Sequence, residues 1–264
     1  MSIWQSIIGK RNQDPEPLHF QVAGDTHLGR VRKHNEDSYL HCVSPDGTRA
    51  LLGVADGMGG HEGGEVASYV AMQSLIAAWN RSLGSEWHNG ESVRKFLDTS
   101  LRQANDHLFH VNQRLKIRRA MGTTATVGGV LNSELIIVHA GDSRCYRLRK
   151  GRLAQLTADQ NWMTEMVRSG RMSILEASMH PLSKTLTNCL GAMPRVDLVC
   201  SASNVLAGDR FLFCSDGVSS MIDDDEIAVA LGQPDSPREV VREAVRRSLL
   251  KGGFDNVSAV CFFA

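Results

Sequence analysis

Residues 123–131 and 134–143 are two apolar runs rich in β-branched residues, and only Asn132 and Ser133 separate them. A two-residue connection lets neighbouring strands pair only in antiparallel fashion, because parallel strands need a crossover of a dozen or more residues. These runs therefore predict a β-hairpin near the middle of the chain. Further strands are predicted for the apolar runs at residues 50–56, 145–151, 210–218 and 256–263.

Helical periodicity is confined to separate blocks of the sequence. Apolar residues recur every third or fourth position from Ala67 to Trp79 and again from Leu97 to Leu115. A third helix is predicted to begin after Ser236 and to end at Gly252–Gly253. Strands in hairpins and helices in blocks argue against a regular βαβ alternation. We predict an α+β fold class with central antiparallel sheets and helices outside them, while periodicity leaves the number of sheets open.

The overall composition excludes several functional classes. Lys plus Arg and Asp plus Glu both number 29, so the net charge is zero and a nucleic acid is not an expected partner. Six cysteines are scattered without a CxxC pair, which argues against a thiolate zinc site and favours a reducing compartment. No run approaches the roughly 18 apolar residues of a membrane span. A cytoplasmic location is therefore predicted.

The first seventeen residues differ from the remainder of the chain. They carry a few apolar residues at helical spacing but lack the basic start and long apolar centre of a secretion signal. We predict that residues 1–17 are a tail or a short docking helix. Because no linker or repeat follows, residues 18–264 are predicted to form a single domain.

Acidic residues recur in one local setting, where an apolar run ends or begins and a small residue is close by. Such residues occupy five points in the chain: Glu36–Asp37, Asp56, Asp142, Asp216 and Asp255. A single acid there is usually an ordinary turn residue. Several strand ends meeting at one edge of a sandwich would instead crowd carboxylates together, and these repel unless a cation neutralises them. The pattern therefore predicts a metal site.

Oxygen ligands select hard cations, namely Mg²⁺, Mn²⁺ or Ca²⁺, over zinc. The glycine-rich turn after Asp56 lets the backbone fold closely around such an ion, and the Gly57 carbonyl is a candidate ligand. The same glycines do not form a Walker loop, because the stretch from Gly57 to Gly64 contains no lysine. A dinucleotide-binding turn is also disfavoured, because Asp56 would repel the pyrophosphate.

Eight segments of the chain, in order, resemble those of the metal-dependent, type 2C serine/threonine protein phosphatases, and in particular the compact bacterial members. They are GRVRKHNEDSYL, VADGMGGHEGGEVAS, MGTTATVGGVL, HAGDSRCYRLRKG, LTADQN, MHPLSKTLTNCLG, FLFCSDGV and DNVSAV, and together they cover about residues 24–263. The resemblance implies a β-sandwich of two antiparallel sheets flanked by helices on both faces. It also implies hydrolysis of phosphoserine and phosphothreonine in proteins by a metal-bridged hydroxide.

The resemblance assigns roles residue by residue. It implies two Mn²⁺ or Mg²⁺ ions held by Asp37, Asp56, the Gly57 carbonyl, Asp216 and Asp255, with Asp56 bridging them and Glu36 close behind. Asp142 matches the ligand of a third, weaker ion, and Arg32 matches the arginine that binds the substrate phosphate. A planar guanidinium suits two phosphate oxygens at once.

The sequence departs from the family pattern at two places. Met58 stands where animal relatives carry a histidine thought to protonate the leaving group, so a metal-bound water becomes the expected acid and His61 an alternative. Gln160 and Asn161 stand where bacterial relatives often carry histidine and serine. Residues 161–183 correspond to the family's mobile flap, and the resemblance implies that they influence which phosphoprotein fits.

The expected partners are phosphorylated proteins, among them a eukaryotic-like bacterial Ser/Thr kinase and its substrates, and the expected state is a monomer. Two alternatives remain open from the sequence. One is a catalytically silent module that binds phosphoproteins, which loss of a core carboxylate would favour, although all four core aspartates are present. The other is a nucleotide-binding enzyme that uses the glycine-rich turn.

Overall fold

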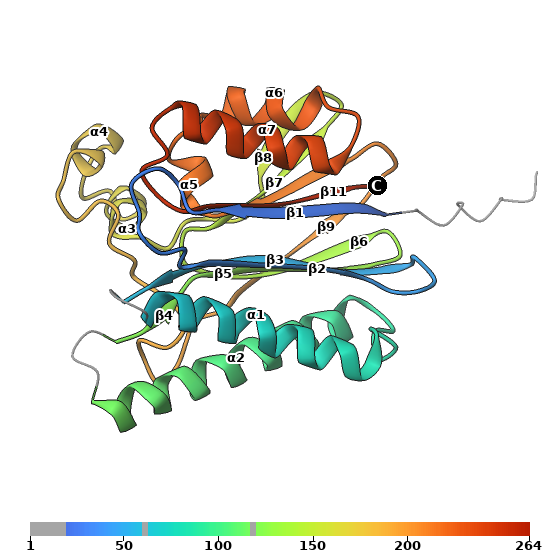
Figure 1. Ribbon diagram of the computed structural model, residues 1–264, viewed down its shortest axis with the longest axis horizontal. Coiled ribbons are helices and arrows are strands. Elements are labelled where there is room, and N and C mark those ends of the chain that lie inside the picture. The colour runs from blue at the N-terminus through green and yellow to red at the C-terminus, as the bar shows by residue number, and fades with distance from the viewer. Residues whose placement is uncertain (1–19, 60–62, 117–119) are drawn as a thin grey trace, which may run out of the picture.

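The computed structural model describes residues 20–59, 63–116 and 120–264. Its centre consists of two antiparallel sheets packed face to face (Figure 1). One has the strand order β1 (Gln21–His27), β11 (Val257–Phe263), β10 (Arg210–Cys214), β7 (Arg144–Arg149), β8 (Arg152–Gln155). The other has the order β2 (Asp37–Val43), β3 (Arg49–Met58), β5 (Ala125–Leu131), β6 (Glu134–Ala140), β9 (Val199–Asn204), and β4 (Gly122–Thr123) pairs with the end of β3.

Helices cover the outer face of each sheet. The long helices α1 (Gly63–Ser82) and α2 (Gly90–Leu115) pack on the sheet that contains β3, while α5 (Asp216–Ser219), α6 (Asp224–Gly232) and α7 (Pro237–Leu250) cover the other (Figure 1). The two sheets bury one apolar layer between them, and each helical layer buries another against its sheet. The predicted α+β sandwich with four layers is therefore confirmed, and the open question of sheet number is resolved as two.

Helix α7 begins and ends as its sequence signals indicate. Ser236 caps α7 through a hydrogen bond from Glu239 N, and Pro237 occupies the first turn, where its missing N–H costs nothing. Asn89 caps α2 in the same way and forms a capping box with Ser92. Within the described residues, no helix combines the length and the apolar character that crossing a bilayer requires.

Three strand predictions were wrong at their ends. The run at 210–218 leaves the sheet at Cys214, and Asp216 begins helix α5 instead. The run at 134–143 ends at Ala140, because Gly141 has a φ of +107° that no strand continues. The run at 123–131 is interrupted at Thr124, whose N–H donates to Asp56 O rather than within β5. Each deviation lies next to a predicted ligand.

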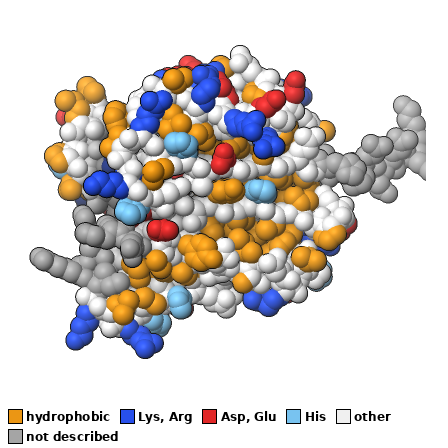
Figure 2. All heavy atoms as spheres, in the orientation of Figure 1, with side chains coloured by type: hydrophobic (Ala, Val, Ile, Leu, Met, Phe, Trp, Pro, Cys, Tyr) orange, Lys and Arg blue, Asp and Glu red, His pale blue; other side chains and the backbone are white. Residues whose placement is uncertain are grey.

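The flap lies to one side of the four layers, between β8 and β9 (Figure 1). It contains two short helices, α3 (Trp162–Arg168) and α4 (Ile174–Ser178). Apolar side chains are visible over α4 (Figure 2), where Leu175 is 71% exposed. The flap therefore presents apolar surface to solvent beside the sandwich.

Candidate metal centre

Both sheets bring acidic residues to the same end of the sandwich. Asp37 opens β2 and lies directly opposite Asp56 of β3 in the antiparallel register. Asp216 is the first residue of α5, directly after the turn at the end of β10, and Asp255 comes shortly before β11. Asp142 belongs to the short connection between β6 and β7. Residues spread over more than two hundred positions are thus collected at one edge, as the sequence predicts.

A pocket of about 610 Å³ opens at this end. Five acidic residues line it: Glu36, Asp56, Asp142, Asp216 and Asp255. Asp37 is buried, and its Oδ2 accepts a hydrogen bond of 2.7 Å from Ser215 Oγ. We call Asp37 and the five lining residues the acidic cluster. Gly57, Met58, Arg32 and Lys184 also line the pocket.

Burial raises the pKa values of five carboxyl groups of the acidic cluster, those of Glu36, Asp37, Asp56, Asp142 and Asp216. The pKa of Asp37 rises to about 7, first because burial penalises the charged form, although the hydrogen bond from Ser215 opposes the rise. Burial also raises the pKa of Asp142 to about 7, and the neighbouring Asp216 adds to the effect. The pKa of Asp56 lies well above its ordinary value because of burial and the charge on Asp37. Gathering these carboxyl groups in a buried pocket therefore disfavours their charged forms.

The donor set fits a hard divalent cation. All the acidic donors are carboxylate oxygens, and Asp216 Oδ1 is buried without a hydrogen-bond partner among the described residues. A buried, unpartnered carboxylate oxygen is costly unless something positive reaches it. Among the described residues, no three acidic, histidine or cysteine side chains are grouped closely enough to hold a metal ion in the present side-chain positions. Magnesium and manganese retain several water ligands, so few protein ligands per ion are needed.

Gly57 is required by packing as well as by its predicted role. A Cβ at this position would lie 2.0 Å from Gly64 O and 2.5 Å from Glu36 O, far inside van der Waals contact. The Gly57 N–H donates to Glu36 O at 3.0 Å. Only glycine therefore lets the end of β3 pass between the start of α1 and the loop before β2.

Arg32 reaches the pocket from the loop between β1 and β2. Its Nη2 donates to Asp255 Oδ2 at 2.6 Å, and its side chain remains 47% exposed. Asn256 fastens this loop, because its Nδ2 donates to Leu28 O and to His34 O while its Oδ1 accepts from Glu36 N. The predicted phosphate-binding arginine is thus held at the rim of the acidic cluster.

Three residues of the site were missed in the sequence analysis. Ser215 and Asn256 stand inside the quoted motifs FCSDGV and DNVSAV, each beside a predicted ligand, and both act by fixing neighbours. Lys184 lines the pocket from the segment after the flap; it stands inside the quoted segment MHPLSKTLTNCLG, but no predicted ligand lies beside it in the sequence. Ser215 and Asn256 could have been found from the sequence, because each stands directly beside a predicted ligand.

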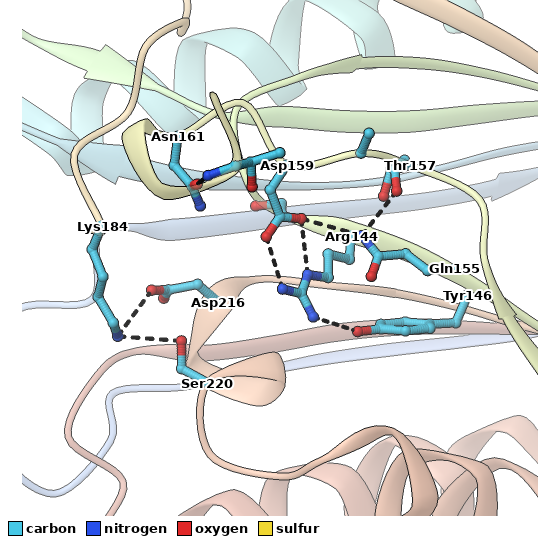
Figure 3. A network of polar contacts seen from close by, with 12 residues as sticks. Arg144, Tyr146, Gln155, Thr157, Asp159, Asn161, Lys184, Asp216 and Ser220 are labelled. Atoms are coloured by element: carbon cyan, nitrogen blue, oxygen red, sulfur yellow. Dashed lines mark hydrogen bonds and ion pairs between the residues drawn. The ribbon is translucent and has the colours of Figure 1, made fainter. Parts of the chain in front are cut away.

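A buried polar network supports the connection that carries Asp142 (Figure 3). Arg144 binds Asp159 through two hydrogen bonds, Nε to Oδ1 at 2.9 Å and Nη2 to Oδ2 at 2.7 Å. Its Nη1 donates to Tyr146 Oη at 2.8 Å. These paired hydrogen bonds fix Arg144, which stands two residues after Asp142 in β7, against the residues that lead into the flap.

None of the remaining candidates for catalysis, Met58, His61 and Cys189, is positioned by the described residues as a proton donor or nucleophile. Met58 lines the pocket and carries no proton to donate. His61 lies outside the described residues, as do residues 1–17. Cys189 also lines the pocket, but burial raises the pKa of its thiol to about 11, which disfavours a reactive thiolate at neutral pH.

Comparisons with known proteins agree with this geometry. The family model described as protein phosphatase 2C matches residues 23–247. The serine/threonine phosphatase stp of Listeria monocytogenes is 30% identical over 235 residues, which span 89% of this chain and 92% of that protein.

Two solved structures superpose closely on this one. PppA, described as a key regulatory component of T6SS in Pseudomonas aeruginosa, has a TM-score of 0.80 at 30% identity, covering 94% of this chain and 99% of that one. The catalytic domain of the phosphatase PstP in complex with two manganese ions has a TM-score of 0.77 at 33% identity, covering 92% and 97%. The chain therefore belongs to the protein phosphatase 2C family of metal-dependent serine/threonine protein phosphatases.

Proposed function

We propose that the acidic cluster binds two Mn²⁺ or Mg²⁺ ions through Asp37, Asp56, the Gly57 carbonyl, Asp216 and Asp255. In this assignment Asp56 would serve both ions, and Asp142 would hold a third, weaker ion. The observation that carries this assignment is the convergence of buried carboxylates with raised pKa values, together with Asp216 Oδ1, which has no hydrogen-bond partner among the described residues. The manganese pair in the PstP structure supports the choice of ion.

Two divalent cations at this position neutralise phosphate charge and activate a water molecule for attack on phosphorus. The protein's own part is to place and shield the reacting groups. Arg32 lies at the rim with most of its donors unused, so it can turn from Asp255 to hold two phosphate oxygens. Ser215 keeps Asp37 oriented, and the tether through Asn256 keeps Arg32 at the pocket.

The substrates are phosphorylated proteins, as the family membership states. We propose that the relevant phosphoserine and phosphothreonine residues are made by a eukaryotic-like Ser/Thr kinase in the same bacterial cytoplasm, and that residues 18–264 act as a single monomeric domain. The kinase itself, phosphorylated on its activation loop, is the most direct substrate to test.

The decisive experiment measures metal binding and turnover together. Calorimetric titration of the chelator-treated protein should show two Mn²⁺ sites, and hydrolysis of a phosphothreonine peptide should require Mn²⁺ or Mg²⁺ and stop with EDTA. Asp216→Asn should lose one metal site and most activity. If wild type and Asp216→Asn bind manganese equally, the ligand assignment is wrong. If both are inert when fully loaded with metal, the catalytic assignment is wrong.

A further inference from the structure

Lys184 extends from the segment that follows the flap into the pocket. Figure 3 shows its side chain directed toward Asp216 of α5 and toward Ser220, which follows that helix. Its Nζ lies 3.9 Å from Asp216 Oδ2 and donates to Ser220 Oγ at 3.2 Å. Lys184 and Arg32 are the two cationic side chains among the described residues that line the pocket.

The contacts of Lys184 are not those of a structural ion pair. Its side chain is 71% exposed, and its contact with Asp216 is longer than a hydrogen bond. The pair between Arg149 and Asp209 illustrates the structural case, with a separation of 2.6 Å and an aspartate only 2% exposed. An exposed lysine at the limit of ion-pair distance contributes little to stability. Apart from the hydrogen bond to Ser220, its N–H donors have no partner within hydrogen-bond distance among the described residues, so they remain available to another anion.

The charge balance of the pocket indicates which anion that is. With two divalent cations bound, the weaker site at Asp142 unfilled and the acidic cluster fully ionised, the six carboxylates outweigh the two cations and Arg32 by one negative charge. A phosphate monoester, itself a dianion, would then approach a site of the same sign. Among the described lining residues, Lys184 supplies the charge that removes this excess.

We propose that Lys184 is a second phosphate-binding residue, which contacts the phosphate of the substrate from the side of the flap while Arg32 contacts it from the β1–β2 loop. The inference deepens the proposed function and rests on its metal assignment. With Asp216 engaged in holding a divalent cation, the ammonium of Lys184 would no longer be attracted to that carboxylate. The long, flexible lysine stem then lets the ammonium follow the arriving phosphate.

The test measures phosphate binding without turnover. Inorganic phosphate is titrated into Mg²⁺-saturated protein, and its dissociation constant is obtained from the rise in Tm. Lys184→Gln should raise that constant about tenfold, the effect of losing one charge-assisted hydrogen bond. Lys184→Arg keeps the charge and should stay within about threefold of wild type. The KM for a phosphothreonine peptide should rise in parallel for Lys184→Gln.

Two controls make the result specific. Lys95→Gln removes an exposed lysine on α2 that does not line the pocket, and it should leave phosphate binding unchanged. The dissociation constant for Mg²⁺, measured calorimetrically, should not rise in Lys184→Gln. The proposal would be overturned if Lys184→Gln left the dissociation constant for phosphate unchanged, or if it changed the dissociation constant for Mg²⁺ instead. Lys184 would then be a counter-ion of Asp216. Wild type that binds phosphate through Lys184 but never hydrolyses the peptide would instead contradict the proposed function.

Discussion

Gln160 and Asn188 are joined by a side-chain hydrogen bond of 2.7 Å, from Asn188 Nδ2 to Gln160 Oε1, across the base of the flap. The same Gln160 oxygen accepts from Gly141 N at 2.8 Å, next to Asp142. Asn188 in turn donates to Asp197 O and accepts from Asp197 N. One glutamine, at a position where bacterial relatives often carry histidine, therefore links both ends of the flap to the connection that carries a proposed ligand.

Replacing Gln160 should loosen this junction. Gln160→Leu leaves the Gly141 N–H and the Asn188 amide without their acceptor, so we expect a loss of about 1–3 kcal/mol in the free energy of unfolding. Urea denaturation measures the loss. In a double-mutant cycle with Asn188→Ala, the two losses should be clearly non-additive. Additive losses would mean that the two side chains act independently.

The stability of the metal-free protein should fall as pH rises from about 4 to about 7. The folded-state pKa values of Asp37 and Asp142 are raised to about 7 from the ordinary 3.8, so the native state holds protons that the unfolded chain has lost. This contribution is fully present below pH 4 and disappears as pH passes the raised values. We expect a decrease of at least about 2 kcal/mol, measured by urea denaturation in EDTA.

Magnesium should reverse this loss, because it binds the ionised cluster only in the folded state. At a hundredfold excess over its dissociation constant, a single site adds about 2.7 kcal/mol. Asp37→Asn should flatten the pH profile of the metal-free protein. A profile equally steep in that variant would contradict the assigned origin.

Arg144 should be far more important to stability than the exposed arginines. Removing it strands the Asp159 carboxylate, whose side chain is only 8% exposed, so Arg144→Ala should cost about 3–5 kcal/mol. Arg144→Lys keeps the charge but not both hydrogen bonds, and it should fall between wild type and alanine. Arg246→Ala, at an exposed pair with Glu243, serves as the control and should cost less than about 1 kcal/mol.

Gly57→Ala should disrupt the candidate metal centre, because the added Cβ clashes with the neighbouring backbone. The added methyl group would overlap Gly64 O at the start of α1, so the backbone must move by more than an ångström or the protein must unfold. We expect a destabilisation of about 3 kcal/mol or more and weakened Mn²⁺ binding. Gly151→Asn, at a turn where nothing lies within 4 Å of the added Cβ, is the matched control. Normal Mn²⁺ affinity in Gly57→Ala would contradict this reading of the close approach.

Arg32→Ala should separate substrate binding from metal binding. Arg32 touches only Asp255 among the proposed ligands, so its loss should raise KM for a phosphopeptide roughly tenfold while both Mn²⁺ constants hold. Steady-state kinetics measures KM, and calorimetry measures the dissociation constants for Mn²⁺. Lost manganese affinity in this variant would show that Arg32 orders Asp255 instead of binding phosphate.

The sequence predicted those parts of the fold that local chemistry determines. Helix α7 has a serine cap, a proline in its first turn and glycines after its end, and all of them act where predicted. Strands β1, β2 and β9 were not among the predicted strands. Strand β9 has four of its six residues exposed, so it carries little hydrophobic pattern. Edge strands of this kind are defined by their neighbours rather than by their own residues.

The candidate site also contains residues that local sequence patterns identify and residues that only the fold brings into place. The acidic cluster was found because five strand ends or loops repeat one local pattern, and their convergence follows from the antiparallel topology. Lys184 was not found, because its place in the pocket depends on how the segment after the flap passes α5. The direct ligand assignments remain predictions, and the tail of residues 1–17 lies outside the structure described.

The flap leaves and rejoins the sandwich at nearly one point, where Gln160 meets Asn188. A segment attached in this way can lengthen, shorten or change sequence while the strands on either side keep their course. Protein recognition can therefore diversify among homologues at little risk to the hydrolytic machinery, which draws its acidic groups from other parts of the chain.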